Sequence, residues 1–247
     1  MIPKIIHYCW FGNCEISEKI KDYISSWKEY LSDYEFKCWN EKNYDVNKYI
    51  FIKEAYELKK YAFVSDMVRL DVLYTYGGLY LDVDMQILSN LDSFLECELL
   101  LGFDSRNSIS LASCFIGCIP KQVFIKYLFD IYTRTKFVLE NGKLNETPNT
   151  VLLTKEIQKF YNTKLVNNKK IINIANGIII YPMEYFHALD LCDGNLYKTF
   201  NTAAIHWHTL LWVSRKTKFI KFIRQKVLIP ILGEEKYLRI TKRIKGF

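Results

Sequence analysis

A helix-to-strand block constrains the fold of this 247-residue chain more than any other feature. From Ala55 to Tyr76, apolar residues recur at helical spacing, which predicts one long helix with a broad apolar face. Gly77-Gly78 predicts its end, because glycine is favoured at helix C-termini. Leu79–Leu81 then predicts a buried strand that ends at Asp82 and Asp84. This order predicts an α/β sandwich with ligands at the carboxyl edge of its sheet.

Shorter patterns predict the remaining elements and the domain organisation. The expected helices cover residues 16–31 and 121–138, and the expected strands cover residues 3–8, 35–39, 171–174, 178–181 and 203–208. Half of the residues are hydrophobic and a quarter are charged, which is a globular composition. The length suits one domain with a short appendage. We expect a domain over residues 1–212 and a basic amphipathic helical tail over residues 213–247.

Positive charge is concentrated at the end of the chain. Residues 215–247 contain 11 Lys/Arg and 2 Asp/Glu, whereas the rest contains 23 and 25 of the total 34 and 27. A nucleic-acid enzyme would spread basic charge along its groove, so no nucleic-acid partner is expected. Two interpretations of the tail stay open: peripheral contact with an anionic membrane surface, or a helical hairpin packed on the domain.

The cysteines and the hydropathy pattern predict a cytoplasmic protein. The seven cysteines contain no CxxC pair, which favours reduced thiols and disfavours a zinc site. We find neither a signal peptide nor an apolar run of roughly 20 residues that could span a membrane. The tail makes a peripheral position on the inner face of the membrane the alternative.

Two aspartates at the end of the predicted strand indicate a metal site. Asp82 and Asp84 are two residues apart, so in a strand both side chains point to the same face. A divalent cation with hard-oxygen preference relieves the repulsion between two such carboxylates. The simpler interpretation is that both aspartates lie at a solvated strand end. The apolar residues before Asp82 indicate a buried strand and so disfavour this interpretation.

Other chemistry-bearing residues each have a structural and a functional interpretation. Asp66 and Arg69 share a helix face, either as an ordinary ion pair or as ligands for sugar hydroxyls and phosphate. His206 and His208 are either buried, hydrogen-bonded side chains or metal ligands. Trp10, after the first strand, is either a core tryptophan or a stacking platform for a flat base.

Three ordered motifs resemble a known family. They are IPKIIHYCWFG at residues 2–12, YAFVSDMVRL at residues 61–70 and YGGLYLDVD at residues 76–84. Together they resemble the glycosyltransferase sugar-binding region containing the DXD motif, which is family 32 of the glycosyltransferases. The resemblance covers residues 1 to about 90 well and residues 204–212 more loosely. It implies a GT-A fold, a single Rossmann-like α/β/α domain that uses Mn²⁺ or Mg²⁺ and retains anomeric configuration.

The resemblance also assigns roles to individual residues. It implies that the nucleotide sugar is bound by Trp10, Tyr61, Ser65, Asp66, Arg69, Asp82 and Trp212. It implies metal ligation by Asp82, Asp84 and His206, with His208 as a rival, and catalytic roles for Asp66, Arg69 and Asp84. Leu211 stands where the family usually has a serine, which puts one hydrogen bond to the leaving phosphate in question.

The resemblance implies a hexosyltransferase. We expect transfer of a hexose from a UDP- or GDP-linked sugar to a glycan or lipid-linked oligosaccharide, in bacterial capsule or surface-polysaccharide synthesis. The alternatives are a metal-dependent phosphohydrolase or nuclease that uses Asp82 and Asp84, and a non-catalytic module that binds sugar nucleotides. The sequence identifies no catalytic base, and Asp104 has no specific support.

Overall fold

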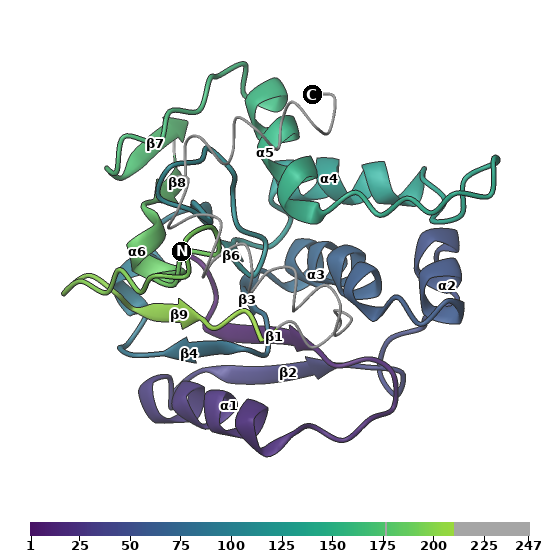
Figure 1. The fold of residues 1–247 in the computed structure, drawn as a ribbon, viewed down its shortest axis with the longest axis horizontal. Coiled ribbons are helices and arrows are strands. Elements are labelled where there is room, and N and C mark those ends of the chain that lie inside the picture. Colours follow the sequence, from purple (N-terminus) through teal and green to yellow (C-terminus); the bar gives the residue numbers. More distant parts are fainter. Residues whose placement is uncertain (176, 210–247) are drawn as a thin grey trace.

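The computed structural model describes residues 1–175 and 177–209, and within them helices and strands surround one central sheet (Figure 1). The strands are β1 (Ile5–Cys9), β2 (Glu35–Trp39), β3 (Gly78–Leu81), β4 (Met85–Ile87), β5 (Leu99–Gly102), β6 (Phe115–Cys118), β7 (Ile172–Ala175), β8 (Ile178–Tyr181) and β9 (Ala204–His206). The helices are α1 (Glu18–Tyr30), α2 (Ile50–Glu57), α3 (Tyr61–Tyr76), α4 (Val123–Thr133), α5 (Asn149–Phe160) and α6 (Met183–Phe186), with a 3₁₀ turn, η1 (Asp92–Phe94).

The central sheet is mixed, with the strand order β2-β1-β3-β6-β5-β8-β7. Its first three strands run parallel, so their carboxyl ends meet at one edge. β6 pairs antiparallel with both β3 and β5. A separate antiparallel ribbon joins β4 to β9. The predicted α/β fold class is confirmed, and β3 lies inside the sheet with its carboxyl end at the shared edge.

Side chains alternate between two hydrophobic cores, one on each face of the sheet. In β3, Tyr80 packs into the core formed with α2, α3, α4 and α5, whereas Leu79 and Leu81 pack into the core formed with α1, β4 and α6. Trp27 of α1 is fully buried in this second core, and its Nε1 donates to the carbonyl of Met85, 2.7 Å away. The three-layer α/β/α arrangement expected of a GT-A domain is therefore present.

The Gly77-Gly78 turn joins α3 to β3 as predicted, and both glycines are required by geometry. Their φ angles are +65° and +99°, which side-chain-bearing residues rarely adopt. A Cβ on Gly77 would lie 2.6 Å from Pro120, and one on Gly78 would lie 2.6 Å from the carbonyl oxygen of Ile5. The close approach of the two backbones sets the position of β3 beside β1.

The predicted long helix is wrong, because two helices occupy the region. The first, α2, ends at Glu57, and Lys59 has a φ of +56°. The N–H of Lys60 donates to the carbonyl of Ala55 and that of Lys59 to the carbonyl of Tyr56, a Schellman motif. Glycine usually occupies the left-handed position of this motif. Because lysine stands there, the residue types carry no signal for the break.

The remaining predictions differ in their bounds or fall outside the described part of the chain. The expected helix over 121–138 is shorter, since α4 spans only Val123–Thr133, and α5 was not anticipated. The predicted boundary at residue 212 and the predicted tail over 213–247 lie outside the described residues. Among the described residues, no helix is both long enough and apolar enough to cross a bilayer.

A buried histidine makes the stability of this fold dependent on pH. His7 is fully buried; its Nε2 donates to the carbonyl of Gly77 at 2.8 Å, and its Nδ1 accepts from Nε1 of Trp39 at 3.1 Å. Burial lowers the pKa of His7 to about 4 from the usual 6.5. The imidazole therefore stays neutral in the folded protein while it takes up a proton in the unfolded chain. Its contribution to stability is present above pH 6.5 and is lost as the pH falls toward 4.

We predict that His7→Gln reduces this dependence, because the amide does not titrate. Between pH 6.5 and 5, the free energy of unfolding of the unmodified protein should fall by roughly 2 kcal/mol more than that of the variant. Urea unfolding at pH 7.5, 6.5 and 5.0 measures both. Equal slopes in the two proteins would contradict the assignment of a neutral buried His7.

Candidate active site

A cavity of about 320 Å³ opens where β3 ends. Its walls come from α3, the turn after β3, the residues before β6, the first turn of α5 and the end of β9. The lining residues are Cys9, Ala62, Phe63, Ser65, Asp66, Arg69, Tyr80, Asp82, Val83, Asp84, Ser113, Pro148, Asn149, Thr150, His206, His208 and Thr209. The cavity thus lies at the carboxyl edge of the sheet, where ligands were expected.

Arg69 is the central cation of this cavity. Its side chain is only 5% exposed, and its Nη2 lies 2.9 Å from Oδ1 of Asp66 and 3.5 Å from Oδ1 of Asp82. Nη1 donates to the carbonyl of Ser113, and the guanidinium lies 4.4 Å from the centre of the Tyr80 ring. Arg69 therefore connects α3 to the ends of β3 and to the start of β6. Asp66 and Arg69 do form an ion pair, and it is buried in the cavity wall.

Asp66 lies on the same wall of the cavity, beside the Arg69 guanidinium, which partly neutralises its charge. Its side chain is 12% exposed, and Nδ2 of Asn149 donates to its backbone carbonyl at 3.2 Å. Burial raises the pKa of Asp66 to about 6, although the Arg69 guanidinium acts in the opposite direction. A buried carboxylate of this kind is suited to accept hydrogen bonds from hydroxyl groups of a ligand.

Asp82 and Asp84 reach the cavity through a turn and not by strand alternation. The strand β3 ends at Leu81, and the N–H of Met85 donates to the carbonyl of Asp82 at 3.0 Å, which closes a four-residue turn. Both aspartates line the cavity, with side chains 30% and 11% exposed. Both aspartates thus line one cavity, but the strand alternation expected from the sequence is wrong, because β3 ends at Leu81, three residues before Asp84.

Asp84 is fixed by residues from the far end of the described chain. Its Oδ1 lies 3.1 Å from Nε2 of His206, and its Oδ2 accepts from the N–H and the hydroxyl of Thr209 at 2.7 and 2.9 Å. Burial alone would raise the pKa of Asp84, but His206 and Thr209 outweigh it and hold the pKa well below its usual range. Burial also disfavours charge on His206, yet Cys114 and Asp84 raise its pKa well above the usual value.

Pairing between β4 and β9 brings His206 to Asp84. Met85 of β4 stands opposite His206 of β9 in the antiparallel ribbon, and the N–H of Trp207 donates to the carbonyl of Asp84 at 3.1 Å. The ring of His208 lies 3.8 Å from that of His206, measured between centroids, and also lines the cavity. His206 contacts the DXD turn through its side chain, at Asp84.

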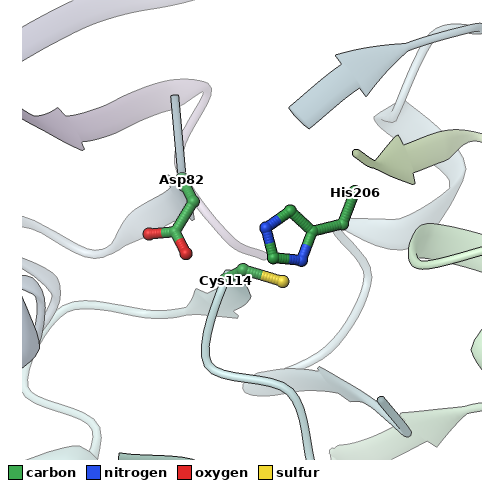
Figure 2. Close-up of side chains that lie close together, drawn as sticks. All are labelled: Asp82, Cys114 and His206. Atoms are coloured by element: carbon green, nitrogen blue, oxygen red, sulfur yellow. The ribbon is translucent and has the colours of Figure 1, made fainter. Parts of the chain in front are cut away.

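Asp82, His206 and the thiol of Cys114 form a cluster whose ligand atoms all lie within 4.8 Å of one another. Figure 2 shows the carboxylate, the imidazole and the thiol facing a common space. Cys114 is 4% exposed, and burial raises the pKa of its thiol while His206 lowers it. Nδ1 of His206 is buried and has no hydrogen-bond partner among the described residues. Carboxylate and imidazole donors around one space, with one ring nitrogen unsatisfied, fit a divalent cation.

The other predicted site residues lie at different distances from the cavity. Ser65 lines it, and its hydroxyl donates to the carbonyl of Tyr61 at 3.1 Å. Tyr61 is not among the lining residues, and its ring packs against Gly12. Trp10 is half-buried beside Val83, with its Nε1 donating to the carbonyl of Cys14 at 2.7 Å. Trp212 and Leu211 lie outside the described residues.

Several cavity residues were not anticipated from the sequence. Asn149 and Thr150 begin α5, and Ser113 lies just before β6, next to Cys114 of the cluster. Asn149 is 3% exposed, and its Oδ1 has no hydrogen-bond partner among the described residues. Pro148, directly before a helical pattern, is the sequence signal that marks the start of α5. No comparable signal marks Cys114, because its place depends on the pairing of β6 with β3.

We predict that Arg69→Met destabilises the protein by about 3–5 kcal/mol, because it leaves the buried carboxylate of Asp66 without its cation. Urea unfolding at pH 7.5 measures the loss. Adding Asp66→Asn to the same chain should recover part of it, since the uncompensated charge is then removed. A single variant as stable as the unmodified protein would contradict the role of Arg69 in the cavity wall.

Three comparisons with known proteins bear on this site. Residues 17–100 match the family described as "Glycosyltransferase sugar-binding region containing DXD motif". Inositol phosphoceramide mannosyltransferase 3 of Schizosaccharomyces pombe is 36% identical over 115 residues, which are 44% of this chain and 32% of that relative. An uncharacterised glycosyltransferase of Acanthamoeba polyphaga mimivirus is 26% identical over 247 residues, covering 94% of this chain and 92% of the viral protein.

Among solved structures, the PaToxG glycosyltransferase is similar, with 20% identity and a TM-score of 0.47 over 64% of this chain and 69% of that one. The match to the yeast mannosyltransferase spans about a third of that relative's length. The family match includes Ser65, Asp66, Arg69, Asp82 and Asp84, all of which line the cavity. Residues 17–100 are therefore similar to the glycosyltransferase sugar-binding region containing the DXD motif, which confirms the resemblance inferred from the sequence.

Proposed function

We propose that this protein is a glycosyltransferase that moves a hexose from a nucleotide-diphosphate sugar to a glycan or lipid-linked acceptor, with a divalent cation at Asp82, Asp84 and His206. One observation carries the proposal. Arg69 contacts both Asp66 and Asp82 in the wall of a cavity that also receives Asp84 and His206. The Arg69 guanidinium, the carboxylates and the imidazole thus converge on one space. A nucleotide-diphosphate sugar requires such groups together, for its diphosphate and for its sugar.

The chemistry of the reaction explains why this charge arrangement is suitable. Breaking the bond between the sugar and the phosphate builds negative charge on the departing nucleoside diphosphate. A bound divalent cation supplies Lewis-acid stabilisation of that charge. Arg69 provides a fixed positive charge beside Asp82, and its contacts to Ser65 and Ser113 carbonyls hold it in place before the donor binds. Little reorganisation is then needed during bond breaking.

Asp66 and Ser65 are proposed to bind the donor sugar. Both come from the first turns of α3 and line the cavity next to Arg69. A carboxylate accepts hydrogen bonds from two neighbouring sugar hydroxyls, and the adjacent arginine keeps it ionised. At neutral pH, above a pKa of about 6, Asp66 is mainly in the accepting form.

We propose retention of configuration, in which the leaving phosphate itself takes the proton of the acceptor hydroxyl. No protein base is assigned. Asp104 is not among the residues that line the cavity, and its Oδ2 accepts from the hydroxyl of Ser110 at 2.8 Å. Asp104 therefore has a structural contact that accounts for it.

The relatives narrow the donors that should be tried first. The yeast relative is named as a mannosyltransferase acting on inositol phosphoceramide. GDP-mannose is therefore the first candidate donor, followed by UDP-linked hexoses. For the acceptor we propose a glycan or lipid-linked oligosaccharide, with surface-polysaccharide synthesis as the setting.

We predict that Mn²⁺ together with a nucleotide sugar raises the melting temperature of the protein, because both bind the native state. Asp82→Asn should remove the metal-dependent part of that shift. Asp33→Asn is the matched control: it is the same chemical change at a residue paired with Lys4, at the opposite end of the strands. The measurement is differential scanning fluorimetry with GDP-mannose and UDP-hexoses. An undiminished shift in Asp82→Asn would contradict the proposal.

The basic tail provides a separate prediction. Residues 215–247 contain 11 Lys/Arg and 2 Asp/Glu, and we propose that they attach the enzyme to an anionic membrane that holds its acceptor. The full chain should sediment with vesicles that contain anionic lipid, should not sediment with neutral vesicles, and should be released by high salt. Equal sedimentation with both kinds of vesicle, or with neither, would contradict this attachment.

A further inference from the structure

We infer that Cys114 is a direct ligand of the cation at this site, so that the site binds a thiophilic divalent ion such as Zn²⁺ or Co²⁺ more tightly than Mg²⁺. The inference deepens the proposed function and rests on it for the purpose of the ion. The donor set that it assigns is Asp82, Cys114 and His206. Cys114 replaces Asp84 of the proposal above, because both oxygens of Asp84 are already bonded to His206 and Thr209.

The first support is the proximity of three different ligand types. Within the described residues, the carboxylate, thiol and ring-nitrogen ligand atoms of these residues lie within 4.8 Å of one another. Figure 2 shows that they lie close together and come from three separate segments. A thiol combined with an imidazole and a carboxylate selects zinc-like ions, whereas Mg²⁺ takes oxygen donors almost alone.

The second support is that the backbone fixes Cys114 in this position. The N–H of Asp82 donates to the carbonyl of Cys114 at 2.9 Å, next to the antiparallel pair Leu81 and Phe115. The thiol side chain is therefore placed by the sheet itself. Cys9 is also buried and lines the cavity, but it is not part of the cluster, so it serves as the control cysteine.

The third support is the hydrogen bonding of His206. Nε2 of this ring lies 3.1 Å from Asp84, whereas Nδ1 is buried and has no hydrogen-bond partner among the described residues. A carboxylate on one ring nitrogen with a metal on the other is the usual arrangement around metal-bound histidines, where it fixes the tautomer and the ring orientation. Asp84 is then the residue that positions His206, and Nδ1 is the nitrogen open to the ion.

Binding of the ion through Cys114 has a definite proton balance. The thiol S–H bond breaks, the proton goes to buffer, and a metal–sulfur bond forms with no change in oxidation state. Asp82 donates an electron pair without losing a proton. His206 binds through Nδ1 as the neutral imidazole, so a proton that Nδ1 carries before the ion binds also goes to buffer. One proton is therefore released by the cysteine for each ion bound.

Cobalt spectroscopy tests the inference on the full chain. Metal-free protein is titrated with Co²⁺ under reducing conditions, and the near-ultraviolet sulfur-to-cobalt charge-transfer band is recorded. The band should appear in the unmodified protein and in the control Cys9→Ser. It should be absent in Cys114→Ser, whose affinity for Co²⁺ should be about tenfold or more weaker. A protein that binds Co²⁺ without the band, or a band that persists in Cys114→Ser, would overturn the inference.

A second measurement needs no variant and covers the case in which Cys114→Ser does not fold. Mn²⁺ bound to the unmodified protein is followed by electron paramagnetic resonance while Zn²⁺ or Mg²⁺ is added. Zn²⁺ should release Mn²⁺ at concentrations at least about tenfold lower than Mg²⁺. Equal competition by the two ions would overturn the inference.

The outcomes for the two proposals are distinguishable. If the sulfur band forms but no nucleotide sugar raises the melting temperature, the cation site stands and the transferase proposal fails. If nucleotide sugars bind with Mn²⁺ but the sulfur band is absent, the transferase proposal stands and Cys114 is not a ligand.

Discussion

The buried guanidinium of Arg69 is the interaction on which the arrangement of this site depends. It joins a helix to the carboxyl edge of the sheet through Asp66, Asp82 and the carbonyl of Ser113. A buried cation with so few exposed atoms is stable only if its donors are satisfied, and here they are met by charged groups and carbonyls. The buried contacts of Arg69 therefore hold α3 against β3 and also place a positive charge on the wall of the cavity.

The two aspartates of the DXD turn have different environments and are suited to different tasks. Asp82 is 30% exposed and shares Arg69 with Asp66, so part of its carboxylate faces the cavity. Asp84 is 11% exposed, and both of its oxygens are engaged by His206 and Thr209. The turn thus presents Asp82 to a ligand, whereas Asp84 anchors the distant segment that contains His206 and Thr209.

Local features of the fold were predictable and long-range ones were not. Gly77-Gly78 marked the end of α3 because only glycine suits its φ angles, and the apolar run after it marked β3. The break at Lys59 escaped because lysine occupies a position that glycine normally fills. Cys114 and Thr209 escaped for another reason: strand pairing brings them to the site, and no pattern within their own segments encodes that pairing.

The pairing of β4 with β9 explains why the site needs the end of the described chain. Asp84 and His206 are 122 residues apart, and the ribbon aligns Met85 with His206 directly after the DXD turn. Because His206 and Thr209 together fix both oxygens of Asp84, the turn that follows β3 is held from two sides, by Arg69 and by β9. A segment that carries only the family match, residues 17–100, would contain Asp82, Asp84 and Arg69 but lack the imidazole, the thiol and the hydroxyl around them. The sugar-binding motif therefore supplies the acids, and the rest of the chain supplies the groups that position them.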